Sequence, residues 1–203
     1  MSASATANGS MSVDATAPSY ASSSFVGSSL WLMPHDPHGR LARLRFEDAG
    51  CGGVPFAPHV TLLAGVGGPP AELVPAVEAL AARLGGPVPL AVDGAGARSL
   101  YFQCVYATIA RGGALLAAND AARAAFDRGG DPAYAPHMSV VYGDLDEASK
   151  APLLARVREE LAGAEFPARS IEVWSTQGTV PEWFPVAVVS LVGEPTRWLV
   201  GRE

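Results

Sequence analysis

The sequence has little cysteine, no long hydrophobic run and no excess of basic residues, and each of these shortages excludes a class of protein. Its two cysteines, Cys51 and Cys104, are too few for a disulfide scaffold, and neither has CxxC or zinc-ligand spacing. No stretch approaches about 18 uninterrupted apolar residues, so no membrane-spanning helix is expected. The formal charge of −6 argues against a long nucleic-acid partner, because proteins that bind the phosphate backbone present basic side chains.

The first 24 residues are rich in serine and alanine, and Asp14 is their one charged side chain. A secretory signal begins with basic residues followed by an apolar core, and an organelle transit peptide is usually rich in arginine; this segment has neither feature. We therefore predict a disordered tail at 1–24, a single domain at 25–203, and a cytoplasmic protein. A chain of 203 residues, 49% of them hydrophobic, is long enough to bury a substantial core.

Apolar periodicity, interrupted by glycine and proline, predicts strands and helices that alternate along the chain. We expect strands at 25–33, 59–64, 88–93, 101–109, 137–142, 170–174 and 186–192, and helices at 36–48, 72–84, 114–126 and 147–161. The third and fourth strands would form a hairpin through the loop 94–99. This alternation indicates an α/β or α+β class and excludes an all-β fold.

One segment of the chain occurs twice. Residues 55–65 read Pro-Phe-Ala-Pro-His-Val-Thr-Leu-Leu-Ala-Gly, and residues 133–143 read Ala-Tyr-Ala-Pro-His-Met-Ser-Val-Val-Tyr-Gly. Aligned without a gap, both copies have an aromatic residue three positions before histidine, Ala-Pro directly before it, a hydroxyl residue two positions after it and glycine six positions after it. The wide separation of the copies predicts two similar lobes, not a tandem solenoid.

Strand periodicity gives the repeat a chemical interpretation. Residues i and i+2 of a strand project from the same face, so His59 points the same way as Thr61, and His137 the same way as Ser139. Two lobes related by a pseudo-two-fold axis would place both pairs across one cleft. Two imidazoles with an ordinary pKa of about 6.5 can divide acid and base roles near neutral pH. The two hydroxyls can donate hydrogen bonds to phosphate oxygens.

A structural role and a metal site are the alternatives for these histidines. A single histidine in a strand is more often a surface or core residue than a catalyst, but here two of four histidines occupy equivalent places in a repeat. Neither motif contains a carboxylate, so the pair would be a poor zinc site, and we expect no metal. His35 and His38 flank Asp36-Pro37, and we interpret them as parts of a helix start. The sequence has no phosphate-binding glycine loop and no Ser-His-Asp order.

The paired motifs resemble the hallmark of the two-histidine (2H) phosphoesterase superfamily, which is two copies of His-x-Thr/Ser-x. Here they are His59-Val60-Thr61-Leu62 and His137-Met138-Ser139-Val140. More narrowly, the chain is similar to the plant and algal cyclic phosphodiesterase branch over about residues 27–195. The further residues that carry this similarity are Ser29-Leu30-Trp31, Phe56, Pro58, Phe102-Gln103-Cys104-Val105-Tyr106, Tyr142 and Glu182-Trp183.

The resemblance implies an α+β bilobal fold with two pseudo-symmetric lobes, each an antiparallel sheet flanked by helices. It implies hydrolysis of ADP-ribose 1″,2″-cyclic phosphate, and of nucleoside 2′,3′-cyclic phosphates to 2′-phosphates, without a metal or cofactor. Carried over by position, His59 and His137 are the catalytic acid–base pair, and Thr61 and Ser139 bind the phosphate. Which histidine is the base stays open, because the repeat makes the two nearly equivalent.

The resemblance also places Tyr142, Phe102 and Trp183 in the substrate site, where the last two would flank the base or ribose. Aromatic residues in such apolar runs are equally suited to a core. We expect a monomer that acts on a small cyclic phosphate, with no long nucleic acid and no membrane as partner. Two alternatives remain: an enzyme of the same superfamily that acts on RNA ends or 2′,5′ linkages, and a non-catalytic nucleotide-binding module.

Overall fold

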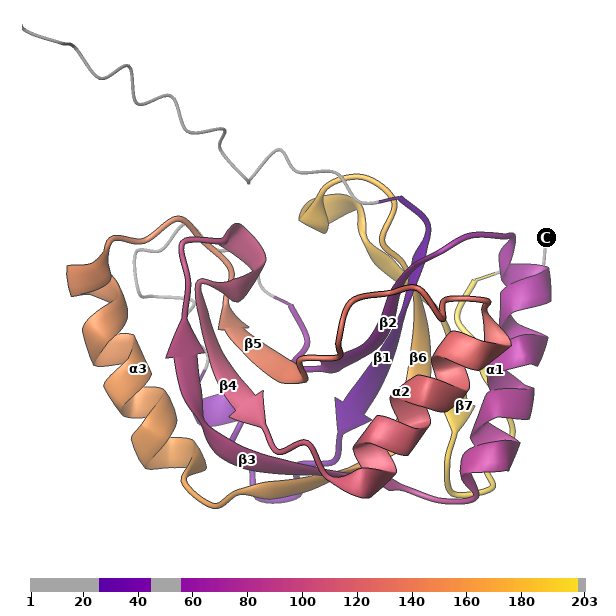
Figure 1. Cartoon of the computed structure of the whole chain (residues 1–203), viewed down its shortest axis with the longest axis horizontal. Helices are drawn as coiled ribbons and strands as arrows, with labels where there is room; N and C mark the ends of the chain where they lie inside the picture. The colour runs from indigo at the N-terminus through magenta and orange to yellow at the C-terminus, as the bar shows by residue number, and fades with distance from the viewer. Residues whose placement is uncertain (1–25, 45–55, 201–203) are drawn as a thin grey trace, which may run out of the picture.

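The strands of the protein pair in antiparallel fashion, which confirms the predicted α+β class (Figure 1). The computed structural model describes residues 26–44 and 56–200. The strands in this part are β1 (Ser28–Pro34), β2 (Val60–Val66), β3 (Val88–Ala97), β4 (Val105–Ile109), β5 (His137–Val141), β6 (Glu165–Ser175), β7 (Phe184–Ser190) and β8 (Arg197–Trp198). The α-helices are α1 (Pro70–Leu84), α2 (Gly113–Ala125) and α3 (Glu147–Leu161), with 3₁₀ turns η2 (Ala42–Leu44), η3 (Tyr101–Gln103) and η4 (Val180–Glu182).

The strands follow the order β1-β2-β5-β4-β3-β6-β7-β8, and β1 also pairs with β6. Strand β6 belongs to both halves of the molecule, because its first part pairs with β3 and its second part with β1 and β7. We call β2, β1, the second part of β6, β7 and β8 the first lobe, and β5, β4, β3 and the first part of β6 the second lobe. The lobes therefore meet along β6 and again where β2 pairs with β5.

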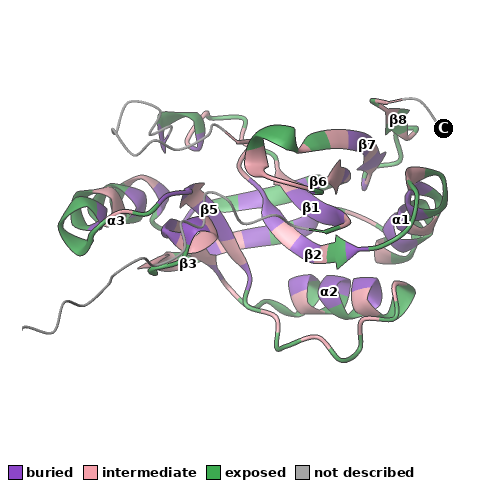
Figure 2. Ribbon diagram, turned by 90° about the horizontal axis from the view of Figure 1, so that it is seen from above, coloured by how far each residue is buried: buried purple, intermediate pink, exposed green. Residues whose placement is uncertain are grey.

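The helices cover the outer faces of the sheet (Figures 1 and 2). Helix α1 packs against β6 and β7, α2 against β2 and β3, and α3 against β3 and β4. Between helices and strands lies one core cluster, in which Leu32, Val60 and Met138 are at most 1% exposed. Alternate residues of the same strands are left to face the opposite side, where the repeat places its polar side chains.

The helix predicted at 36–48 is wrong within residues 36–44. The Asp36 carboxylate accepts hydrogen bonds from the backbone of Arg40 and Leu41, at 3.0 and 2.7 Å, but the chain forms turns and only the short η2 follows. Gly39 has φ +64°, a left-handed conformation that interrupts helical propagation. The rest of that helix, the tail at 1–24 and Cys51 lie outside the described residues.

The predicted hairpin of β3 and β4 forms, but its turn lies further along the chain than expected. Strand β3 continues to Ala97, and Tyr101–Gln103 forms a 3₁₀ turn before β4 begins. Gly96 makes the extension possible, because a Cβ there would lie 2.6 Å from the Tyr106 ring that covers it. None of the helices in the described part of the chain is long and apolar enough to cross a membrane.

Candidate functional site

The strands of the two copies pair with each other at one described pair of residues. Val60 of β2 pairs with Met138 of β5, and these residues occupy the same position in the two copies. An antiparallel pair has a local two-fold axis, and this one relates His59 to His137 and Thr61 to the equivalent hydroxyl residue of the second copy. The sequence repeat thus coincides with a local two-fold relation in the sheet.

All four polar side chains of the repeats face away from the core. Val60 and Met138 are buried in the core, so the residues on either side of them project from the opposite face. His59 is then opposite Ser139, and His137 is opposite Thr61. The two histidines are therefore diagonal neighbours, and the Cα atoms of such residues in antiparallel strands are roughly 7–8 Å apart. The electrostatic effect of His137 on the pKa of His59 agrees with this proximity.

Each imidazole is oriented by its own chain. His59 Nδ1 donates to the carbonyl of Ala57 at 2.7 Å, and His137 Nδ1 donates to the carbonyl of Ala135 at 3.0 Å. A carbonyl oxygen only accepts, so both neutral rings carry their proton on Nδ1 and leave Nε2 as an acceptor. The Ala-Pro-His sequence common to the two copies supplies this bond, because proline favours an extended preceding residue.

His59 lies beneath an aromatic stack. Its ring is parallel to that of Trp31, with centroids 3.6 Å apart and an interplanar angle of 7°, and Trp31 stacks in turn on Trp174 at 4.3 Å. The histidine is 4% exposed. Burial lowers its pKa from 6.5 to about 4, against the hydrogen bond to Ala57, which raises it, while nearby His137 lowers it further. Unliganded His59 is therefore neutral at pH 7.

The stability of the fold is expected to fall as the pH drops from 6.5 to about 4. Over this range the unfolded chain protonates His59, whereas burial keeps the folded form neutral, so the unfolded state binds more protons. At about 1.36 kcal/mol per pH unit, the free energy of unfolding loses up to about 3 kcal/mol. Urea unfolding of wild type and His59→Gln at each end of the range measures this loss, with exposed His38→Gln as control. Equal losses in all three proteins would contradict the prediction.

His137 has a different set of partners. The Gln103 side-chain amide lies 3.4 Å from His137 Nε2, and Arg98 Nη1 donates to Gln103 Oε1 at 3.0 Å. The arginine thereby fixes the amide with its NH₂ toward the imidazole, where it donates to the Nε2 lone pair. Burial lowers the pKa of His137, the bond to Ala135 raises it, and the Arg98 charge lowers it. Gln103 and Arg98 thus favour the neutral, proton-accepting form of His137.

Replacing Arg98 with methionine is expected to raise the pKa of His137. The guanidinium disfavours a second positive charge nearby, and without it the Gln103 amide is also free to turn. Histidine titrations followed by NMR measure the change, and exposed Arg83→Met on α1 is the matched control. A pKa of His137 that is the same in Arg98→Met as in Arg83→Met would show that the arginine does not act on this imidazole.

The two hydroxyl groups of the motifs are bonded differently. Ser139 is 7% exposed and donates to the carbonyl of Phe102 at 2.8 Å. The Thr61 hydroxyl has no hydrogen-bond partner within residues 26–44 and 56–200, although its backbone carbonyl accepts from the Tyr134 hydroxyl at 2.9 Å. Thr61 therefore offers an unengaged donor on the same face as both imidazoles.

Aromatic side chains from both lobes surround this face. Phe102 of the second lobe stacks on Trp183 of the first, with centroids 5.7 Å apart and an interplanar angle of 17°. Tyr142 is 5% exposed and stacks on Phe56 at 3.7 Å, with Phe102 edge-on to it at 5.2 Å. The structure thus brings the three aromatic residues predicted from the sequence together with the four motif residues. Phe102 and Trp183 are half-buried, which leaves part of each ring accessible.

Several residues of the site were given no role from the sequence. Three of them, Trp31, Gln103 and Phe56, belong to segments that carry the family resemblance. Nothing in the sequence indicated that Trp31 would cover His59 or that Gln103 would contact His137. The repeat did contain a signal for Phe56, since an aromatic residue precedes each histidine by three positions. Arg98 carried no signal, because its position follows from the extension of β3.

No group of three or more His, Cys, Asp or Glu side chains that could hold a metal occurs among the residues that the structure describes. The polar groups that converge on the site are two imidazoles, hydroxyls, an amide and a guanidinium. Such a set can move protons and donate hydrogen bonds to an anion.

Comparison with known proteins gives two findings. The family model for the 2′-5′ RNA ligase superfamily matches residues 24–179. The crystal structure of E. coli LigT complexed with 3′-AMP is 15% identical, with a TM-score of 0.51 over 82% of this chain and 98% of that one. The apo form of E. coli LigT is 16% identical, with a TM-score of 0.50 over 81% and 98%. At this identity the likeness concerns the fold alone. No curated protein sequence matches the chain.

Proposed function

Because the chain belongs to the 2′-5′ RNA ligase superfamily of two-histidine phosphoesterases, we propose that it opens cyclic phosphodiesters by metal-independent acid–base catalysis. The observation that carries the proposal is the antiparallel pair Val60–Met138, which places His59 and His137 diagonally on one face of the sheet. The expected substrates are ADP-ribose 1″,2″-cyclic phosphate and nucleoside 2′,3′-cyclic phosphates, the latter opened to 2′-phosphates.

The proposed reaction is an in-line displacement at phosphorus. One imidazole accepts a proton from water at Nε2 while the water oxygen bonds to phosphorus. The other donates its Nε2 proton to the departing ribose oxygen as the P–O bond breaks. Both rings have Nδ1 tied to a backbone carbonyl, so Nε2 is the nitrogen left for proton transfer, and on His137 the substrate would replace the Gln103 amide at this atom. Proton uptake and release balance, and one water is consumed.

Binding of the anionic substrate would promote protonation of the imidazole that acts as the acid. Both histidines have a lowered pKa in the free protein, so neither is protonated to a large extent at pH 7. A negative charge within about 4–6 Å favours the imidazolium and raises its pKa. Binding a cyclic phosphate between the rings would therefore recruit one proton to the pair.

The hydroxyls and aromatic rings would bind the rest of the substrate. Thr61 and Ser139 would donate to the non-bridging phosphate oxygens, where charge increases in the transition state. Phe102 and Trp183, which stack on each other from the two lobes and are each partly exposed, would offer flat surfaces to a base or ribose. LigT was crystallised with 3′-AMP, a mononucleotide with a ribose phosphate, which supports a substrate of this size.

Phosphorus NMR of the products tests the proposal. The full chain is incubated with ADP-ribose 1″,2″-cyclic phosphate and with each of the four nucleoside 2′,3′-cyclic phosphates. We expect the cyclic ester signal to be replaced by a phosphomonoester signal, at the 2′ oxygen for the nucleotides. If none of these substrates is opened while the protein binds them, the non-catalytic binding module is the correct alternative.

The name of the matched family favours one second candidate, an enzyme that cleaves 2′,5′ linkages or processes RNA ends. The net charge of −6 opposes a long RNA groove. A comparison of 2′,3′-cyclic AMP with a cyclic-phosphate-ended oligonucleotide and a 2′,5′-linked dinucleotide separates the two functions. Faster turnover of either oligonucleotide would favour the second candidate.

A further inference from the structure

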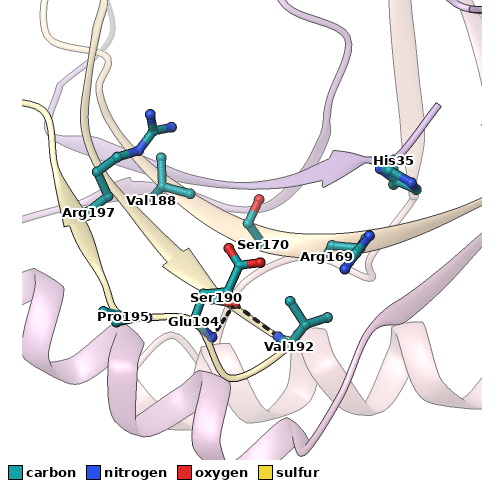
Figure 3. Close-up of a pocket in the computed structure, with 9 residues that line it drawn as sticks. All are labelled: His35, Arg169, Ser170, Val188, Ser190, Val192, Glu194, Pro195 and Arg197. Atoms are coloured by element: carbon teal, nitrogen blue, oxygen red, sulfur yellow. Dashed lines mark hydrogen bonds between the residues drawn. The ribbon is translucent and has the colours of Figure 1, made fainter. Parts of the chain in front are cut away.

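A second polar pocket lies at the far end of the first lobe, with a volume of about 550 Å³ (Figure 3). Strands β6, β7 and β8 form it, together with His35 just after β1. Arg169 and Arg197 lie on opposite sides of the pocket in Figure 3, with Ser170 and Ser190 between them. None of these residues has a role in the reaction proposed above.

The pocket lies on the same sheet face as the catalytic motifs. One row of directly paired residues runs from Thr61 to Trp31, Glu172, Val188 and Arg197. Paired residues of neighbouring strands project from the same face, so Val188 and Arg197 face the side on which Thr61 lies.

A neighbouring row places the serines on that face as well. Met33 pairs with Ser170, and Ser170 pairs with Ser190. Strands lie about 4.8 Å apart, so Ser170 on β6 is roughly 10 Å from β2, which begins next to His59, and Arg197 on β8 is four spacings, roughly 19 Å, from β2. A ligand bound beside His59 would have to extend about 10 Å to reach the serines, and the long Arg197 side chain would have to reach back along the sheet to meet it.

The chemistry of the pocket suits an anion. The Ser190 hydroxyl accepts hydrogen bonds from the backbone of Val192 and Glu194 at 3.0 and 3.1 Å, so its own proton remains to be donated (Figure 3). Within the described part of the chain, the Arg169 and Arg197 guanidinium groups make no hydrogen bond or ion pair. The lining residues include two guanidinium groups and one carboxylate, that of Glu194, and the Glu172 carboxylate beside the pocket interacts with the Arg197 charge.

We propose that this pocket binds a second phosphate of the substrate, a phosphodiester or pyrophosphate carried on the part remote from the cyclic ester. Guanidinium groups match phosphate geometry and are weakly hydrated, which suits them to this role. The inference rests on the proposed function, since it assigns the pocket to the substrate of that site. It makes ADP-ribose 1″,2″-cyclic phosphate, which carries a pyrophosphate, a better substrate than a mononucleotide, which has no second phosphate.

Steady-state kinetics of the double variant R169Q/R197Q tests the assignment. We expect KM for ADP-ribose 1″,2″-cyclic phosphate to rise roughly tenfold with kcat unchanged, because only binding remote from the reacting atoms is lost. KM for 2′,3′-cyclic AMP should stay the same. The matched control, R83Q/R158Q, removes two exposed arginines of α1 and α3 and lowers the net charge equally. Unchanged kinetics for both substrates, or an equal change for both, would overturn the assignment.

Calorimetry with ADP-ribose provides a measurement that does not depend on turnover. This ligand has the pyrophosphate but no cyclic ester, and we expect R169Q/R197Q to bind it several-fold more weakly than wild type and R83Q/R158Q. If wild type opens no cyclic phosphate, the proposed function fails, and weaker ADP-ribose binding by the variant still supports the pocket. Equal affinity in all three proteins would reject the pocket whether or not turnover is observed.

Discussion

Replacing His137 with glutamine is expected to lower kcat for cyclic phosphate hydrolysis by roughly 10²–10⁴-fold, the usual contribution of general acid–base catalysis. Glutamine can keep a hydrogen bond to the carbonyl of Ala135, but it cannot take up or release a proton at the position of Nε2. His59→Gln should have an effect of similar size. Because the two imidazoles act in one proton-transfer cycle, the double variant should be little slower than either single one. Phosphorus NMR and a coupled phosphatase assay measure the rates.

His38→Gln is the control for this prediction, since His38 is exposed, lies in the turns after β1 and belongs to neither copy of the repeat. Circular dichroism and urea unfolding near pH 7 check that the variants keep the fold, and EDTA in every assay removes any contribution from a contaminating metal-dependent enzyme. Turnover within about fivefold of wild type in a folded His137→Gln protein would reject the role of this residue as acid or base.

The second large effect is expected for Thr61→Val, which should lower kcat/KM by roughly 10²–10³-fold, as removal of a transition-state donor does in other sites. Valine has nearly the shape of threonine, so the change removes the hydroxyl alone. Its proton is unengaged within the described residues and can bind phosphate without first breaking another bond. The Ser139 hydroxyl must leave the carbonyl of Phe102, so Ser139→Ala should cost less than Thr61→Val.

Thr61→Ser separates the hydroxyl from the methyl group of the same side chain. It should restore most of the activity that Thr61→Val loses, because the donor returns at the same place. A Thr61→Ser protein as slow as Thr61→Val would indicate that the residue acts through packing against Trp31, its paired neighbour on β1. An unchanged kcat/KM in Thr61→Val would remove Thr61 from the phosphate site.

The sequence was sufficient to predict the arrangement around the two histidines because the information there is local and repeated. Alternation along a strand placed each histidine and its hydroxyl partner on one face, and the repeat indicated a pseudo-two-fold relation between the copies, but not that Val60 and Met138 pair directly. The motif boundaries and helices α1, α2 and α3 were predicted within a few residues for the same reason, since glycine and proline mark their ends.

Other features depend on contacts that no local pattern encodes. The stack of Trp31 on His59 requires the register of β1 against β2, and the contact between Gln103 and His137 requires the 3₁₀ turn that replaces the start of the expected strand. At Asp36 the sequence did contain a capping carboxylate, but the left-handed conformation of Gly39 ended the turn before a helix could form. Strand register, the 3₁₀ turn and the backbone conformation of one glycine determined these three features, and none of them can be read from a local sequence pattern.

The location of the Val60–Met138 pair has a consequence for how the protein can move. Phe102 and Trp183 come from different lobes and are held together by ring stacking, not by backbone pairing, so any relative motion of the lobes would change the distance between these two rings. The imidazoles flank the Val60–Met138 pair, where the two lobes are joined through paired strands, so such a motion would change their spacing less than that of the two rings. Relative motion of the lobes would then act mainly on the contacts of the base and ribose.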